Sequence, residues 1–222
     1  MLSCDLHVHT IFSRDGESTP LEIIRRAEAV GLDAIAITDH DTVEGAIAAL
    51  SIPTSLVIIP GIEISTRQGH LIALGVTEKI PSGLDVIETI HLAKERGAIL
   101  ILPHPYHVWR HGVGRKLRSA LYSVDAIEVF NSRYIVGSAN LKAARMARRI
   151  CKPCVAGSDA HHERYVGFGR TTIDAKKDCG SILAAIREGK TSAAGKMTPL
   201  PSYTRQTIRN TWKKFRRRIY HR

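Results

Sequence analysis

Short apolar runs that end in histidine, aspartate or glutamate recur along this chain, and they constrain its fold more than any other feature. The first run begins at Cys4 and ends in His7 and His9. The second covers residues 34–38 and is followed by the triplet Asp39-His40-Asp41. Later segments repeat the pattern, namely GIEIS, GHLIALG, ILILPHP, IEVFNS and CVAGSDAHH. Each run is typical of a buried strand that stops at side chains able to bind a metal ion.

Amphipathic helical patterns separate these runs. The clearest begins at Thr19, a predicted N-cap, has Pro20 in its first turn and ends at Gly31. We also expect helices over residues 42–50, 81–96, 138–150 and 179–188, whereas residues 107–121 are ambiguous between loop and helix. Strands are expected over residues 4–8, 34–38, 55–65, 70–76, 98–102, 126–130, 155–157, 171–173 and 191–194.

Strands that alternate with helices predict an α/β fold built from parallel βα units. A barrel is favoured over an open sheet because ligand-bearing strand ends recur throughout the chain, and a barrel brings all of them to one face. The chain has neither a glycine-rich dinucleotide loop nor a P-loop. We therefore expect one barrel domain over residues 1–200 and a separate tail over residues 201–222.

The tail carries most of the positive charge. The chain of 222 residues has a formal charge of +11, but residues 203–222 contain eight bases and no acid, which leaves +3 for the rest. One helical face of the tail would be apolar, since it would carry Ile208, Trp212, Phe215 and Ile219. Three roles are open for this basic amphipathic helix: packing on the barrel, lying on an anionic membrane surface, or binding nucleic acid.

The sequence predicts a cytoplasmic protein. No apolar run approaches the roughly 18–20 residues needed to cross a bilayer, and the N-terminus enters a strand pattern without a signal-peptide core. Cys151 and Cys154 form a CxxC motif, which raises zinc or redox chemistry, but no second CxxC completes a four-sulfur site. We therefore expect the cysteines to be buried structural thiols.

The polar strand ends indicate a metal centre. His7 and His9 lie two residues apart at a strand end, so both imidazoles point to the same side and can reach one cation. Glu63 interrupts an apolar strand, where an unpaired carboxylate is energetically costly. The simplest explanation is that Glu63 is a ligand that bridges metal ions. We expect either Asp39 or Asp41 to cap the following helix. The candidate ligands are His7, His9, Asp15, His40, Glu63, His70, His104, Asp159 and His161.

Nine nitrogen and oxygen ligands without a thiolate exceed one tetrahedral site and suit two or three divalent ions of manganese, zinc or iron. Clustered divalent ions are suited to phosphoester hydrolysis, with a hydroxide that bridges two metals as the attacking group. The predicted catalytic residues are His40, Glu63, Asp159 and His161. Glu128 also interrupts an apolar strand, and we leave open whether it is a ligand, a support for a ligand or a partner of Arg133.

The ordered motifs DLHVHTIFSRDG, GLDAIAITDHDT, GIEIS, GHLIALG, PHP and GSDAHH resemble the PHP superfamily of polymerase and histidinol phosphatase domains. The resemblance covers roughly residues 3–195 and implies a distorted (β/α)7 barrel, a three-metal cluster and metal-dependent phosphoesterase activity. It implies that the first metal is bound by His7, His9, Glu63 and Asp159, the second by Glu63, His70 and His104, and the third by Asp15, His40 and His161. The segment after His104 is shorter than in small-molecule members, which often carry an insertion that closes over a nucleotide.

An anionic substrate needs cations beyond the metals, and the loops after the predicted strand ends supply them. The predicted substrate-binding residues are Arg133, Asn131, His107 and Arg164, of which Arg133 is the strongest. Asn131 would either contact substrate or cap the following helix. The acid that protonates the leaving group would be His161 or His107.

The favoured function is hydrolysis of a phosphomonoester of a nucleotide or another small phosphorylated metabolite. A nuclease or 5′-to-3′ exonuclease acting on RNA or DNA is an alternative, made credible by the basic tail and the short, open segment beside the site. Histidinol-phosphate hydrolysis is a further alternative that no feature favours. A non-catalytic accessory module is the alternative from another class, and the intact ligand set argues against it.

Overall fold

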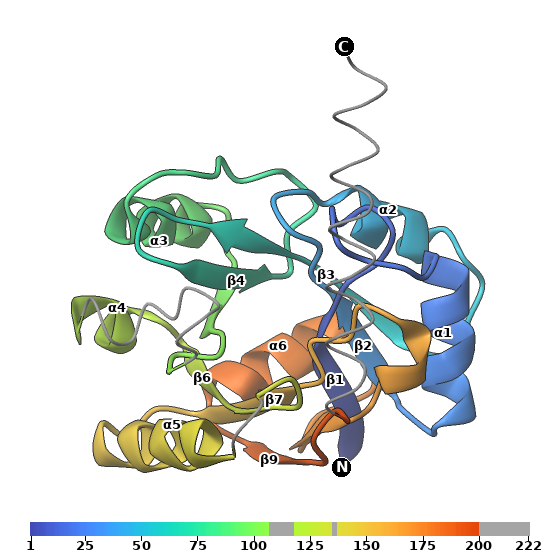
Figure 1. The fold of residues 1–222 in the computed structure, drawn as a ribbon. Coiled ribbons are helices and arrows are strands. Elements are labelled where there is room, and N and C mark those ends of the chain that lie inside the picture. Colours follow the sequence, from blue (N-terminus) through green and yellow to red (C-terminus); the bar gives the residue numbers. More distant parts are fainter. Residues whose placement is uncertain (107–117, 135–136, 200–222) are drawn as a thin grey trace.

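A computed structural model describes residues 1–106, 118–134 and 137–199, and in this part of the chain nine strands form one sheet (Figure 1). The strands are β1 (Leu2–Val8), β2 (Ala34–Ile37), β3 (Val57–Ser65), β4 (His70–Leu74), β5 (Ile99–Leu102), β6 (Ala126–Asn131), β7 (Cys154–Gly157), β8 (Gly169–Ile173) and β9 (Thr191–Gly195). The helices are α1 (Pro20–Ala29), α2 (Glu44–Leu50), α3 (Val86–Glu95), α4 (Arg118–Ser123), α5 (Ser138–Arg149) and α6 (Cys179–Arg187), with a 3-10 turn η2 (Glu163–Tyr165). The predicted basic tail helix and His107 lie outside the described residues.

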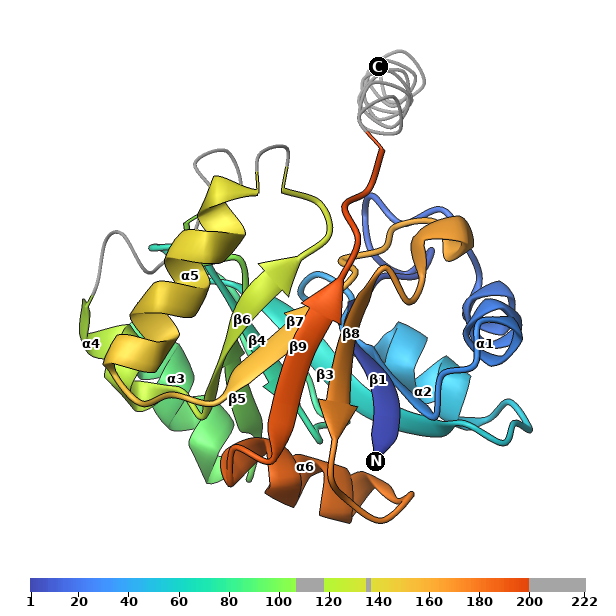
Figure 2. The same cartoon turned by 90° about the horizontal axis from the view of Figure 1, so that it is seen from below.

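The sheet has the strand order β7-β6-β5-β4-β3-β2-β1-β8-β9 and curls into a nearly closed barrel. Just after β7, Asp159 donates its backbone N–H to the His7 carbonyl in β1, and His9 donates to the Ala160 carbonyl, both at 2.8 Å. Figure 2 shows α1 and α2 on one side of the sheet and α3, α4 and α5 on the other. The predicted α/β barrel is therefore confirmed.

The expectation of parallel βα units throughout is wrong for three strands. β1, β2 and β3 are parallel, as are β5, β6 and β7. β4 is antiparallel to both of its neighbours, β8 is antiparallel to β1, and β9 is antiparallel to β8. Between β3 and β4 the chain has only residues 66–69, where the Thr66 N–H and hydroxyl donate to the Gly69 carbonyl at 2.8 and 2.6 Å. A parallel connection needs about a dozen residues or more, so this short turn produces a hairpin.

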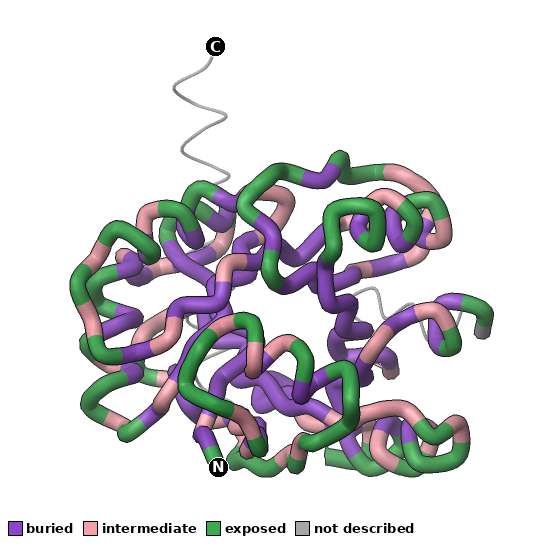
Figure 3. The backbone as a smooth tube through the Cα atoms, turned by 180° about the vertical axis from the view of Figure 1, so that it is seen from behind, coloured by how far each residue is buried: buried purple, intermediate pink, exposed green. Residues whose placement is uncertain are grey.

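Strands β1 to β7 are buried along most of their length (Figure 3), whereas β8 alternates buried and partly exposed residues and β9 has no buried residue. All residues of β2 and β5 are buried, which explains their uninterrupted apolar sequences. Ile62, Leu100 and Ile127 belong to one core cluster, while Ile24 of α1 packs in another that includes Ile35 of β2. This packing holds the strands, and therefore their polar ends, in fixed positions.

The start of α1 matches the sequence prediction. The Thr19 hydroxyl accepts from the Glu22 N–H at 3.3 Å, and the Glu22 carboxylate accepts from the Thr19 N–H at 2.7 Å, which is a capping box. Cys4 is buried as predicted, but the prediction is wrong for Cys151, which is exposed in the turn after α5, and Cys154 and Cys179 are partly exposed. No helix among the described residues is long and apolar enough to cross a membrane.

Candidate metal centre

The nine predicted ligands converge at the end of the barrel where β1, β2, β5 and β7 stop. His7, His9, Glu63, His104, Asp159 and His161 are buried, and Asp15, His40 and His70 are partly exposed. His104 and Asp159 follow β5 and β7 with φ angles of 30° and 52°. Positive φ is uncommon for residues other than glycine and is concentrated at functional sites. The chain therefore accepts an unfavourable backbone at the two strand ends that deliver these side chains.

Glu63 is at the centre of the cluster, and its two carboxylate oxygens face different histidines. Its Oε1 lies 2.9 Å from His70 Nδ1 and 3.1 Å from His104 Nε2. Its Oε2 lies 3.3 Å from His7 Nε2 and 3.2 Å from His40 Nδ1. A carboxylate that faces two groups of imidazoles in this way has the geometry of a bridging ligand.

A second subset lies around His9. Its Nε2 is 3.0 Å from His7 Nε2, 3.3 Å from Glu63 Oε2 and 3.5 Å from Asp159 Oδ1. At most one proton can lie between the two imidazole nitrogens that face each other. Their convergence on two carboxylate oxygens is the arrangement expected of ligands that share a cation.

The third subset contains Asp15, His40 and His161. Asp15 Oδ2 lies 3.1 Å from His161 Nε2 and 3.9 Å from His40 Nε2. The loop between β1 and α1 holds Asp15 in place through Ser13, whose hydroxyl donates to Asp15 Oδ1 at 3.1 Å and accepts from the His40 N–H at 3.2 Å. The residues assigned by resemblance to the third metal are thus neighbours.

The donor set fits divalent metal ions. Four overlapping trios have ligand atoms within 4.8 Å of one another: His9, His40 and His161; His7, His9 and Glu63; His7, His104 and Asp159; and His40, Glu63 and His70. The buried Nδ1 of His40 makes no hydrogen bond, although it faces Glu63. An unsatisfied buried nitrogen beside a buried carboxylate is unfavourable unless a cation lies between them. Imidazole and carboxylate donors without thiolate suit zinc, manganese or iron.

The electrostatics of the metal-free cluster are strongly coupled. Burial alone would raise the pKa of Glu63, but the imidazoles of His40, His70 and His7 hold it well below its usual range. Burial also opposes protonation of His9, yet hydrogen bonds to Asp159 and Glu63 raise its pKa to about 9. Glu63 and Asp159 likewise raise the pKa of His7 despite its burial, so protons on His7 and His9 compensate the carboxylates when no metal does.

The pKa of His161, like that of His40, lies below its ordinary value because of burial. Burial and the Arg133 guanidinium lower its pKa to about 4, although Asp15 opposes the shift. A neutral imidazole can bind a metal directly but is a poor proton donor at neutral pH. The low pKa of His161 therefore favours its role as a metal ligand over its predicted role as the acid that protonates the leaving group.

Glu128 supports the cluster from behind. Its Oε1 lies 3.0 Å from His7 Nδ1, and its Oε2 accepts from the His104 N–H at 2.8 Å and from Asn131 Nδ2 at 2.9 Å. Among the alternatives left open by the sequence, the structure therefore favours support of a ligand. A carboxylate on the far nitrogen fixes the tautomer and orientation of a histidine ligand.

Asn131 and Arg133 lie beside this support. Asn131 is fully buried; its amide group donates to Glu128 and to Asp159 Oδ2, and its Oδ1 accepts from the Arg133 N–H. It joins supporting and ligating carboxylates and does not cap α5, whose N-cap is Gly137. The Arg133 guanidinium contacts His161 Nδ1 and lies 3.7 Å from Asp159 Oδ1, so it does not pair with Glu128. Arg133 thus places a positive charge at the edge of the cluster.

Arg164 is exposed in η2, where its guanidinium lies 6.0 Å from the Tyr165 ring centre. It is therefore on the surface of the loop that follows His161, and it does not join the buried cluster.

Three supporting acids were missed or misassigned from sequence. Asp39 accepts from the Thr10 N–H and hydroxyl at 2.6 and 2.7 Å, and Asp41 accepts from the Ser65 N–H at 2.7 Å. Neither caps α2, whose N-cap is Val43 without a side-chain bond, so that prediction is wrong. Asp5 is buried within β1, and burial raises its pKa to about 6. An acid between Cys4 and Leu6 was the available signal for this third residue.

Comparison with known proteins identifies the class. The PHP domain matches residues 5–112, and the PHP-associated domain matches residues 137–191. The chain therefore belongs to the PHP domain family. Seven of the nine predicted ligands lie within residues 5–112, and Asp159 and His161 lie within residues 137–191.

The relatives include proteins with different activities. An uncharacterized protein of Methanocaldococcus jannaschii is 33% identical over 187 residues, which are 80% of this chain and 75% of that protein. A 5′-3′ exoribonuclease of Haemophilus influenzae is 26% identical over 94% of this chain and 71% of its own length. A 3′,5′-nucleoside bisphosphate phosphatase of Chromobacterium violaceum is 35% identical over 45% of this chain and 39% of its own length.

A solved structure has the same fold. A two-domain protein from Bacteroides vulgatus, which contains a predicted PHP-like metal-dependent phosphoesterase, superposes with a TM-score of 0.75 at 22% identity. The match covers 88% of this chain and 65% of that one.

Proposed function

We propose that this chain is a metal-dependent phosphoesterase that hydrolyses a phosphomonoester of a nucleotide or another small phosphorylated metabolite. The observation that carries the proposal is the divided contact of Glu63, with His70 and His104 on one oxygen and His7 and His40 on the other. Two or three ions of manganese, zinc or iron would be bound there. When bound, such ions lower the pKa of water and stabilise negative charge on a phosphoryl group.

The residues of the chain would divide the remaining tasks. Glu63, His7 and His9 would bind and separate the cations, and Glu128 would keep the His7 ring in the orientation that exposes Nε2. The Arg133 guanidinium, 3.7 Å from Asp159 Oδ1, would hold a phosphate oxygen beside the cluster. Because the Arg133 guanidinium is already held by His161 and Asp159, it would lose little conformational freedom when substrate binds.

A 5′-3′ exonuclease is the second candidate. It is supported by the similarity to the Haemophilus influenzae exoribonuclease, which extends over 94% of this chain. The eight bases and no acid of residues 203–222 would favour a polyanionic substrate. For the same reason the tail is a candidate contact for nucleic acid or for an anionic membrane surface.

Metal analysis combined with a substrate screen tests both candidates. The manganese-supplemented full-length protein would be assayed with mononucleotides, 3′,5′-bisphosphates, histidinol phosphate and 5′-phosphorylated short RNA. We expect bound divalent metal and phosphate release from a mononucleotide or bisphosphate, and at least a hundredfold loss of activity in His40→Ala. His91→Ala is the matched control, because His91 is exposed on α3 and lies outside the cluster.

The results separate the candidates. Stepwise release of mononucleotides from RNA, with little activity on free phosphomonoesters, would favour the exonuclease. Activity that is unchanged in His40→Ala would exclude the cluster as the catalytic site. A metal-loaded protein that is inactive on every substrate would favour an accessory role.

A further inference from the structure

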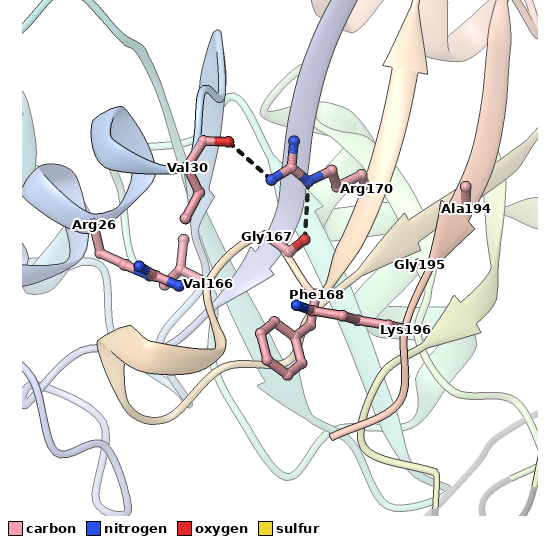
Figure 4. A pocket seen from close by; sticks show the side chains of 9 residues that line it. All are labelled: Arg26, Val30, Val166, Gly167, Phe168, Arg170, Ala194, Gly195 and Lys196. Carbon is pink, nitrogen blue, oxygen red and sulfur yellow. Dashed lines mark hydrogen bonds between the residues drawn. The ribbon is translucent and has the colours of Figure 1, made fainter. Parts of the chain in front are cut away.

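A second, strongly basic pocket lies between α1 and the edge of the sheet formed by β8 and β9 (Figure 4). It has a volume of about 320 Å³ and includes the apolar side chains of Val30, Val166 and Phe168 in its lining. Pockets that bind small molecules usually have volumes of about 300 Å³ or more. None of its lining residues belongs to the metal cluster.

Three cations line this pocket: Arg26 from α1, Arg170 from β8 and Lys196 just after β9. No aspartate or glutamate is among the described residues that line it. No carboxylate in the described part of the chain forms an ion pair with any of the three cations. Elements distant in sequence thus place three like charges around one pocket, and a cluster of like charges favours binding of an anion.

Arg170 is held in place by two backbone carbonyls. Its Nε donates to the Gly167 carbonyl at 3.0 Å, and its Nη2 donates to the Val30 carbonyl at 2.9 Å (Figure 4). The second bond satisfies a carbonyl at the end of α1, which is a structural role. A guanidinium has five N–H donors, so these two bonds leave others for a ligand. Arg170 is therefore a fixed cation with donors to spare.

The other two cations have fewer commitments. The Nε of Arg26 is buried and has no hydrogen-bond partner, and Figure 4 shows its guanidinium extending from α1 toward Val166. A buried N–H without a partner is unfavourable, so a small shift of this guanidinium toward an acceptor in the pocket would relieve the cost. Lys196 Nζ lies 4.1 Å from the centre of the Phe168 ring, a cation–π contact that keeps the amino group over the pocket.

The wall of this pocket separates it from the metal centre. The Gly167 carbonyl faces Arg170, while the Gly167 N–H donates to the buried carboxylate of Asp5 at 2.8 Å. The other oxygen of Asp5 accepts from the Ser158 N–H at 2.9 Å, one residue before Asp159. Asp5 and the Gly167 peptide thus stand between the two sites, and an anion in the pocket would not contact the metal ligands.

We propose that this pocket is a second anion site, which binds inorganic phosphate or a small phosphate ester between Arg26, Arg170 and Lys196. Arg170 would provide the preoriented guanidinium, and Arg26 and Lys196 would close on the phosphate from α1 and from the chain after β9. The apolar walls would accommodate the non-phosphate part of an ester.

Isothermal titration calorimetry of the metal-loaded, full-length protein with inorganic phosphate tests the site. We expect two binding events in the wild-type protein, one of them absent or at least tenfold weaker in Arg26→Gln/Lys196→Gln, since each substitution removes a charge-assisted contact. That same event should persist in His40→Ala. The control is Arg25→Gln/Lys176→Gln, which removes two exposed cations that do not line the pocket and should retain both events.

Melting temperatures of all variants would show that the pocket substitutions leave the fold intact. If folded Arg26→Gln/Lys196→Gln binds phosphate as the wild type does, or if the second event disappears in His40→Ala, the proposal is overturned. A further titration with a short oligoribonucleotide distinguishes the source of the phosphate. Loss of RNA binding in the pocket variant, with no pocket event for inorganic phosphate, would overturn the small-ligand assignment in favour of a polynucleotide contact.

Discussion

Replacing Glu128 by glutamine should weaken metal binding although Glu128 is not itself a predicted ligand. In the structure one carboxylate oxygen faces His7 Nδ1 at 3.0 Å, and the other accepts from the His104 N–H at 2.8 Å and from Asn131 Nδ2 at 2.9 Å. All of these neighbours are donors when His7 presents its other nitrogen to a metal. Glutamine has one acceptor oxygen and one NH2 group, so in either orientation an N–H would face a donor.

The size of the effect follows from the number of bonds lost. Glu128 is 1% exposed, so solvent cannot replace a missing partner. A hydrogen bond to a buried charged group contributes about 1.5–3 kcal/mol, which corresponds to roughly 10–150-fold in an equilibrium constant. Since the bond to His7 fixes a ligand, we expect most of this loss to appear as metal affinity, in agreement with the roughly 10–100-fold typical of such supporting groups.

The assay is a competition for manganese or zinc between the protein and a chelator, with bound metal measured by plasma mass spectrometry. Glu88→Gln, an exposed substitution of the same type on α3, is the control and should match the wild type. Metal affinity in Glu128→Gln within about twofold of the wild type, with an unchanged melting temperature, would refute the assignment of Glu128 as the residue that orients His7.

Three further predictions concern the same centre. His9 has a pKa of about 9 in the metal-free protein, so metal binding must displace its proton. Metal affinity should therefore rise with pH up to about 9. Calorimetry in buffers of different ionisation enthalpy counts the protons released. The raised pKa also stabilises the metal-free fold below about pH 6.5, and this contribution should be lost as the pH rises through about 9, visible as a falling melting temperature after chelation. Gly157→Ala should lower metal content and destabilise the fold by about 1–3 kcal/mol or more, since its Cβ would lie 2.4 Å from His7 Cβ and 2.6 Å from Glu128 Oε1. Gly180→Ala is the control, because its Cβ within α6 would meet only Asp178 Oδ1, at an ordinary 3.6 Å, and it should not lower the unfolding free energy.

The strand ends could be predicted from sequence because two independent signals coincide there. An apolar run such as residues 99–102 marks a strand buried on both faces, and the abrupt change to His104 marks where it leaves the core. Barrel topology then brings the ends together without any pairwise information. Strand direction was harder to predict from the sequence, because the four-residue turn at residues 66–69 is the only local signal that β4 is antiparallel.

The supporting residues could not be assigned in the same way because their roles depend on distant partners. Asn131 has an ordinary sequence context for a helix cap, and only the approach of Asp159 and Glu128 gives its amide another task. Asp5 is similar, since its partners Ser158 and Gly167 lie more than 150 positions away. The local sequence predicts which groups a side chain can bind, whereas the folded barrel determines which of those groups lie close enough to be bound.

The metal centre is therefore complete only when the barrel is closed. His7 and Asp159 come from opposite ends of the described chain, and the bond from the Asp159 N–H to the His7 carbonyl joins the strands that carry them. Asp5 strengthens the same seam, because its carboxylate accepts from the Ser158 N–H beside Asp159. Glu63 then contacts imidazoles from several strands, so no single βα unit can form the site. A metal ion bound there would stabilise the closed sheet over any state in which β7 has separated from β1, since only the closed sheet offers the complete set of ligands.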